Sequence, residues 1–158
     1  MLYRAPSAVV LIDPQLPPDP EELWPALDER VDGQAVVVLT TIRFHGRSRE
    51  AVVARYDAAV GAPPAGVEPF PLERADEVMY WLPEHATLVA GDRLIGDGAG
   101  GVRMCPDSWL SYIPGKPGQD DLREALLPLL QLPVQRVLVS HGEPVFADGR
   151  AALARALA

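Results

Sequence analysis

Two valine-rich runs constrain the fold of this chain more than any other feature of its sequence. Residues 7–13 read SAVVLID and residues 34–41 read QAVVVLTT. Short apolar runs rich in β-branched residues are typical of strands that are buried on both faces. Because such strands need helices on each side, the sequence predicts a layered α/β domain with a mixed sheet.

Helix and strand patterns alternate along the rest of the chain. Asp19 and Pro20 mark a helix start, and Pro25 either kinks that helix or begins it afresh. A proline-rich connection follows the second helix and has room for one short strand. The predicted helices span 19–31, 48–58, 106–113, 118–132 and 148–158. Two further strands form a hairpin over 76–92 that turns at 83–85, and another strand spans 133–140.

Composition narrows the class of protein. The 158 residues suit one domain, 1–158, and a net charge of -8 argues against a nucleic-acid partner. No apolar run approaches the roughly 18 residues of a membrane span, and the N-terminal run is interpreted as a strand rather than a signal peptide. The single cysteine, Cys105, excludes an internal disulfide and a cysteine-rich zinc site. We therefore expect a soluble, cytoplasmic protein with no membrane partner.

Polar residues stand at the ends of the predicted strands. They are Asp13, Thr40 with Thr41, Asp92, and Ser140 with His141. The carboxyl ends of strands are where α/β proteins build their sites, although any strand-to-loop transition is also polar. His141, which follows an apolar strand and precedes a glycine, is thus a metal ligand, a catalytic base or a structural residue.

Taken in order, these segments resemble the metallo-β-lactamase fold family over most of the chain. AVVLIDP is similar to an early strand that ends in Ile-Asp, and EVMYWLPEHATLVAGDRLIG to a hairpin that ends in Gly-Asp. RVLVSHGEPV is similar to the late strand that ends in His-Gly. The resemblance implies a four-layered αββα sandwich, shortened at the N-terminus because little precedes residue 7.

The metal-binding signature of the family is degenerate here. When VVVLTTIRFHGRS is set on it, Thr41 and Arg43 fall where the first two histidines belong, and His45 falls at the aspartate. The middle histidine of the family has no counterpart in PLERADEV, so the three imidazoles of a first zinc site are missing. Only Asp92 and His141 keep the residues that the family has at its ligand positions.

The resemblance leaves two functions open. The first is a non-hydrolytic small-molecule-binding or regulatory domain without a resident metal, in which Thr41, Arg43 and Glu143 contact a small or anionic ligand. The second is an enzyme. It is either a hydrolase that holds one zinc ion with His45, Asp92 and His141, with Asp92 and His141 as the catalytic residues, or a metal-free site that uses Arg43 and His141. Glu143 and Asp13 are the carboxylates expected to orient His141. The family acts on lactams, thioesters, phosphodiesters and lactones, so the resemblance selects no substrate.

The other polar features favour structural roles. His85 is expected in solvent at the hairpin turn, Cys105 is expected to be inert, and the glycine-rich segment 96–101 is expected to be a loop that binds no phosphate. A missing N-terminal hairpin would leave a sheet edge uncovered. We therefore expect a symmetric homodimer.

Overall fold

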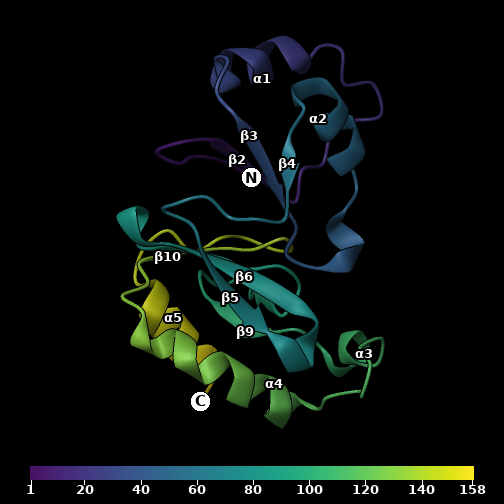
Figure 1. The fold of residues 1–158 in the computed structure, drawn as a ribbon. Helices are drawn as coiled ribbons and strands as arrows, with labels where there is room; N and C mark the ends of the chain where they lie inside the picture. The colour runs from purple at the N-terminus through teal and green to yellow at the C-terminus, as the bar shows by residue number, and fades with distance from the viewer. The chain divides into compact units, whose positions relative to one another are not determined.

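A computed structural model describes the whole chain, residues 1–158. The chain divides into two compact units, Met1–Val67 and Glu68–Ala158, and each contains a four-stranded sheet and helices (Figure 1). The expectation of a single domain over residues 1–158 stays a prediction.

The sheet of the N-terminal unit has the order β1-β2-β3-β4. Its strands are β1 (Leu2–Arg4), β2 (Val9–Ile12), β3 (Val36–Leu39) and β4 (Ala59–Val60). β2, β3 and β4 are mutually parallel, and β1 runs antiparallel to β2, so the sheet is mixed as predicted. The sequence interpretation missed β1 and β4. A single short strand, β1, therefore precedes β2 where the family resemblance implied a complete hairpin, which agrees with the expected N-terminal shortening.

Two helices, α1 (Trp24–Val31) and α2 (Arg49–Tyr56), follow β2 and β3. α1 begins afresh at Pro25, which lies in its first turn, so the start expected at Asp19 is wrong. Both helices end at an aspartate in the left-handed conformation, Asp32 and Asp57. Aspartate is among the few residues that adopt this conformation at low cost.

The core of the N-terminal unit explains the two valine-rich runs. All residues of β2 and β3 are buried, as predicted. Both helices contribute to one apolar cluster on a single face of the sheet, instead of one helix on each face. The cluster consists of Val9, Leu11, Val31, Val36, Val38, Val52 and Ala58.

The sheet of the C-terminal unit has the order β10-β7-β6-β5. Its strands are β5 (Glu68–Leu72), β6 (Glu77–Leu82), β7 (Thr87–Val89) and β10 (Arg136–Leu138). β6 and β7 form the predicted antiparallel hairpin, and β10 lies parallel to β7. The turn of the hairpin is the short 3-10 helix Pro83–His85, at the position expected from the sequence.

β5 is the edge strand of this sheet and carries two prolines, Pro69 and Pro71. Residues two apart along a strand point their nitrogen atoms to the same side. Proline lacks a backbone N–H, so within sheets it is confined to edge strands, with this side turned away from the ladder. The proline-rich connection therefore contains a strand that can serve only as an edge.

A second hairpin flanks the glycine-rich segment 96–101, whose residues 97–101 form the turn where a loop was expected. β8 (Leu94–Gly96) and β9 (Val102–Met104) pair antiparallel as a separate two-stranded sheet. The side chain of Asp97 accepts hydrogen bonds from the backbone N–H groups of Ala99 and Gly101 at 2.7 and 2.9 Å. Two backbone N–H groups of the turn are thus bound by the carboxylate of Asp97 within the same turn.

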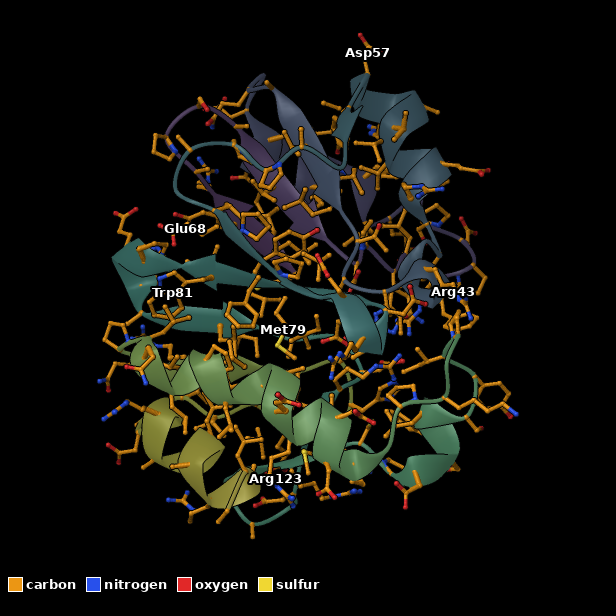
Figure 2. The ribbon with its side chains drawn as sticks, turned by 60° about the horizontal axis from the view of Figure 1, so that its bottom comes forward. Arg43, Asp57, Glu68, Met79, Trp81 and Arg123 are labelled. Atoms are coloured by element: carbon orange, nitrogen blue, oxygen red, sulfur yellow. The ribbon has the colours of Figure 1, made fainter.

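The remaining helices are α3 (Asp107–Leu110), α4 (Gln119–Leu126) and α5 (Gly149–Ala156). The helix predicted over 118–132 changes to a 3-10 helix at Leu127, because Pro128 removes a backbone donor. α4 and α5 lie along the same side of the strands (Figure 1), and Met79 of β6 is buried in the core that they share (Figure 2). None of the helices combines the length and apolar character needed to cross a membrane.

Candidate functional site

Asp13 organises the polar residues of the N-terminal unit. Its Oδ1 accepts the backbone N–H of Thr41 at 2.8 Å, and its Oδ2 accepts the Thr41 hydroxyl at 2.5 Å. The same Oδ2 lies 2.9 Å from Nδ1 of His45. One carboxylate therefore holds both a threonine and a histidine that sequence analysis placed at ligand positions.

The parallel pairing of β2 and β3 produces this arrangement. Both strands end at the same edge of the sheet, so Asp13 after β2 meets Thr41 after β3. Asp13 has a φ of 48°, which turns the chain sharply where the strand stops. The 3-10 helix Arg43–His45 then brings the imidazole back over Asp13.

His45 is held in one orientation and one tautomer. Its side chain is 2% exposed, and the contact with Asp13 makes Nδ1 the protonated nitrogen. A histidine that binds a metal typically donates one ring N–H to a carboxylate and coordinates through the other nitrogen. In His45 that coordinating nitrogen is Nε2.

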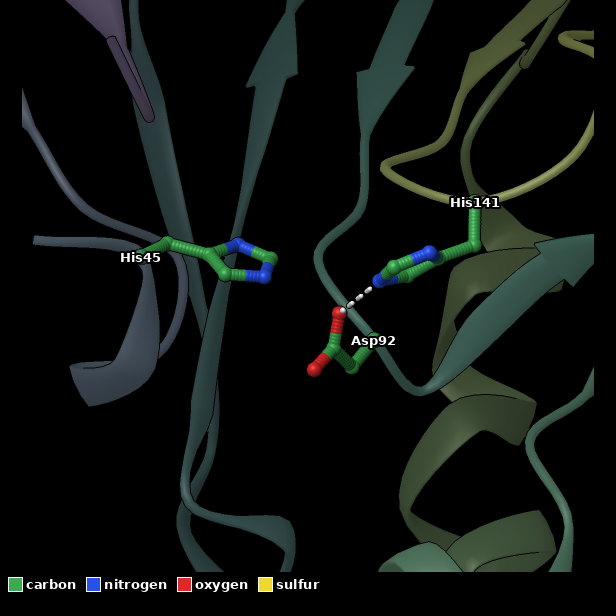
Figure 3. Close-up of side chains that lie close together, drawn as sticks. All are labelled: His45, Asp92 and His141. Carbon is green, nitrogen blue, oxygen red and sulfur yellow. Dashed lines mark ion pairs between the residues drawn. The ribbon is translucent and has the colours of Figure 1, made fainter. Parts of the chain in front are cut away.

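A second histidine–carboxylate pair lies in the C-terminal unit. Nε2 of His141 is 3.4 Å from Oδ1 of Asp92, as the dashed line in Figure 3 shows. The pair forms because β7 and β10 are parallel neighbours, so the loops that follow them leave the same edge of the sheet. The ring of Trp109 packs edge-on against His141, with centroids 5.2 Å apart. His141 is 46% exposed, whereas Asp92 is 17% exposed and its Oδ1, the atom that faces His141, is buried.

Two glycines fix the loop that carries His141. The carbonyl of His141 accepts the N–H of Gly96 at 2.9 Å. A Cβ on Gly142 would lie 2.9 Å from the Cα of Gly96, and Gly142 has a φ of 80°. The close approach and the backbone conformation both require glycine at position 142.

Glu77 holds the loop that carries Asp92. Its Oε1 accepts the N–H of Gly91 at 2.9 Å, and its Oε2 accepts those of Asp92 and Arg93 at 2.7 and 3.0 Å. Glu77 and Arg93 are 4% and 2% exposed, and the guanidinium of Arg93 also donates to the carbonyl of Ala75.

Burial raises the pKa of Glu77 to about 7, although the three N–H donors and the charge of Arg93 act in the opposite direction. The carboxylate therefore changes charge in the neutral range, directly beneath the Asp92 loop. A buried acid with such a pKa is commoner at functional sites than elsewhere.

The structure places the other predicted residues as follows. Arg43 is exposed and its guanidinium lies over the ring of Phe44, 4.7 Å from the centroid. Arg43 is labelled in Figure 2. Glu143 is exposed and follows the Gly142 turn, and His85 is exposed on the hairpin turn. Cys105 is buried and burial raises its pKa, which favours the inert thiol that was expected.

The carboxylate partners differ from those expected. Asp13 was expected to orient His141, but it contacts His45, and the carboxylate beside His141 is that of Asp92 rather than Glu143. The sequence interpretation assigned no role to Glu77. One signal was present, since a glutamate begins an otherwise apolar strand, EVMYWL.

The donor chemistry fits one metal ion and not two. The N-terminal unit offers one imidazole, that of His45, and the C-terminal unit offers one carboxylate and one imidazole, those of Asp92 and His141. Two imidazoles and a carboxylate are an ordinary zinc ligand set. The positions of the missing family histidines carry Thr41, whose hydroxyl is bound to Asp13, and Arg43, which is cationic. A second ion has no comparable ligand set.

Comparisons with known proteins identify the fold. No protein-family model matches the chain, and no curated protein matches it. Among solved structures it is similar to the DIM-1 metallo-β-lactamase, with 16% identity, a TM-score of 0.64 and coverage of 99% of this chain and 83% of that one. It is also similar to a metallo-β-lactamase from Erythrobacter litoralis, with 15% identity, a TM-score of 0.67 and coverage of 99% and 81%.

A third solved structure is TTHA1623 in a di-iron-bound form, with 21% identity, a TM-score of 0.66 and coverage of 99% of this chain and 91% of that one. At these identities the likeness concerns the fold alone. It confirms the fold class predicted from the strand-end segments.

Proposed function

Because this chain has the metallo-β-lactamase fold, we propose that it binds one divalent metal ion through His45, Asp92 and His141 and hydrolyses a small-molecule substrate. The observation that carries the proposal is the contact between Asp13 Oδ2 and Nδ1 of His45, 2.9 Å long and almost completely buried. That contact gives His45 the tautomer and orientation of a metal ligand.

Several further features support a single ion. The Asp92–His141 pair adds a carboxylate and a second imidazole, and zinc accepts this set with one position left for water or substrate. Such an ion would supply a Lewis acid that polarises a carbonyl or phosphoryl oxygen. The chain itself would orient His45 through Asp13, hold the Asp92 loop through Glu77 and steady the His141 ring against Trp109.

Hydrolysis is the reaction class that the solved neighbours suggest. Two of them are named metallo-β-lactamases, and a third is described in a di-iron-bound form. The apolar and aromatic side chain beside His141, Trp109, would contact an organic substrate. We expect a small molecule rather than nucleic acid as the substrate, because the net charge of -8 disfavours a polyanion.

A second candidate is a binding or regulatory domain without turnover. The observation that favours it is the absence of the three-imidazole set, since the chain has only three histidines and His85 lies on the far turn of the hairpin. In that case Arg43, Thr41 and Glu143 would contact the ligand.

The first experiment is calorimetric titration of the metal-free protein with Zn²⁺. We expect one ion per chain for the wild type, and loss of binding in His45→Ala, Asp92→Ala and His141→Ala. His85→Ala is the matched control and should bind zinc like the wild type. Negligible heat in the wild type, or equal binding in His85→Ala and His141→Ala, would refute the one-metal site.

The second experiment compares zinc-loaded and zinc-free protein on lactam, thioester, phosphodiester and lactone substrates. Hydrolysis of one class that requires zinc and is lost in Asp92→Ala would support the hydrolase. Stoichiometric zinc binding without turnover on any class would favour the second candidate.

A further inference from the structure

Glu77, the first residue of β6, contacts the loop that follows β7. In the β6–β7 hairpin, Tyr80 pairs with Val89, Trp81 with Leu88 and Leu82 with Thr87. Continued in the same register, the ladder would set Glu77 opposite Asp92. β7 ends at Val89, however, and the next residue, Ala90, donates its N–H to the carbonyl of Leu138 in β10 rather than to β6.

At this point the side chain of Glu77 supplies the hydrogen-bond acceptors that the backbone of a paired strand would otherwise supply. Three consecutive backbone N–H groups, those of Gly91, Asp92 and Arg93, donate to its two carboxylate oxygens at 2.7 to 3.0 Å. Buried backbone donors need acceptors, and a carboxylate is a stronger acceptor than a carbonyl. The path of residues 91–93 therefore depends on one side chain.

The side chain of Arg93 adds two interactions that link this loop to the start of β6. Its guanidinium offsets the buried charge of Glu77 and donates to the carbonyl of Ala75, which precedes β6 by two residues. Both ends of the loop that carries Asp92 are thus bound to the start of β6. This arrangement fixes the backbone of Asp92 while leaving its carboxylate, which is 17% exposed, directed toward His141.

From this geometry we infer that Glu77 is a positioning residue for the metal site, one that sets the carboxylate of Asp92 in place by holding the backbone of residues 91–93. The inference rests on the proposed function. Glu77 touches neither substrate nor metal, and it acts only through the Asp92 loop.

The test compares Glu77→Gln with the wild type. Glutamine keeps the length and one acceptor oxygen, but its amide group turns N–H donors toward at least one of the backbone N–H groups. We expect zinc affinity to fall about 10- to 100-fold, the range seen when a partner of a metal ligand is removed. Glu77→Asp keeps the charge but is one methylene shorter, so its affinity should lie between those of the wild type and Glu77→Gln.

Two measurements distinguish a positioning role of Glu77 from a general effect of the substitution on protein stability. The first is the visible spectrum of the Co²⁺-loaded protein, which reports coordination geometry and should change in Glu77→Gln. The second is amide hydrogen exchange of residues 91–93 in the metal-free protein, which should accelerate. The matched control is Thr87→Val, which removes a buried hydroxyl bound to the carbonyl of His85 at the other end of the same hairpin. It should lower stability without changing the Co²⁺ spectrum or the zinc affinity.

The outcomes distinguish the two proposals. If the wild type binds no zinc, the proposed function fails and the role of Glu77 toward a metal fails with it. If the wild type binds zinc and Glu77→Gln binds it equally well, with an unchanged Co²⁺ spectrum, only the inference about Glu77 is overturned. Equal losses of affinity in Glu77→Gln and Thr87→Val would also overturn it, because the effect would then be one of stability.

Discussion

The two units of this chain each contain a histidine–carboxylate pair, and the pairs are built in opposite ways. In the N-terminal unit Asp13 contacts Nδ1 of a buried His45, behind the nitrogen that would bind a metal. In the C-terminal unit Asp92 contacts Nε2 of a half-exposed His141, and the two side chains are themselves proposed ligands. The first pair orients a histidine, whereas the second consists of two proposed metal ligands that contact each other.

The two pairs consist of the same residue types, but they are preorganised for metal binding to different degrees. His45 needs no movement to present Nε2, because Thr41 and Asp13 are bound to each other as well as to the ring. Asp92 and His141 must exchange their mutual contact for contacts to a metal. Metal binding should therefore rearrange the C-terminal pair and leave the N-terminal pair unchanged.

The largest effect is expected for Asp13→Asn. The asparagine amide would donate toward Nδ1, so the His45 proton would move to Nε2 and block coordination. We expect zinc affinity to fall by up to about 100-fold, and the free energy of unfolding to fall by about 1.5 to 3 kcal/mol because hydrogen bonds to a charged carboxylate are lost. Calorimetry and urea unfolding measure both quantities. Asp28→Asn, which removes a carboxylate bound to Arg55 in the same unit, should leave zinc affinity unchanged.

A pH dependence is expected from Glu77, which supports only the C-terminal pair. The pKa of Glu77 is raised from 4.5 to about 7 in the folded protein, so between these values the folded state binds the proton more tightly than the unfolded state. Stability of the metal-free protein should therefore fall as pH rises through this window, by about 3 kcal/mol relative to Glu77→Gln, and then level off. Urea unfolding of both proteins from pH 5 to 8 tests this. If the free energy of unfolding depended on pH in the same way in the wild type and in Glu77→Gln, this prediction would be contradicted.

Gly142→Ala should weaken the C-terminal pair through the backbone. The new Cβ would lie 2.9 Å from the Cα of Gly96 at a φ of 80°, so the His141 loop must shift. We expect a loss of about 2 kcal/mol in the free energy of unfolding, with reduced zinc affinity. Gly98→Ala is the matched control. It has a similar φ of 77° but nothing within 4 Å, so it should cost less and leave zinc binding intact.

The smallest effect is expected for Trp109→Leu. The edge-on contact with His141 contributes about 1 kcal/mol beyond the burial of the ring. Zinc affinity should fall only a few-fold, because Asp92 and His141 are still present. A loss as large as that of Asp13→Asn would mean that Trp109, rather than the ligands themselves, organises the C-terminal pair.

Sequence reasoning found the residues of both pairs but not how they pair. Asp13, Asp92 and His141 stand just after apolar runs, so the predicted strand ends were sufficient to select them. His45 was selected only because VVVLTTIRFHGRS was set on the signature of the family that the chain resembles. Which carboxylate meets which histidine depends on strand order, and β2 beside β3 or β7 beside β10 is a long-range choice that no local pattern encodes. For the same reason Asp13 was paired with the wrong histidine.

The missed elements have local causes. β1 and β4 are three and two residues long, too short for a periodic signal. β8 and β9 flank a run of glycines whose turn is closed by Asp97, a side-chain contact that composition alone does not reveal. Glu77 was passed over because a charged residue at the start of a strand usually lies in solvent, and only the hairpin register, continued beyond its last pair, would set Glu77 opposite Asp92.

The prolines of β5 bear on how the protein behaves at high concentration. With no N–H at positions 69 and 71, the outer side of this strand lacks donors at alternate residues, so another strand cannot add to it in a regular ladder. Amyloid growth and edge-to-edge dimerisation both depend on such a ladder. Any homodimer of this chain must therefore form through side-chain surfaces or another strand, and replacing both prolines with valine should make the C-terminal sheet prone to fibril formation.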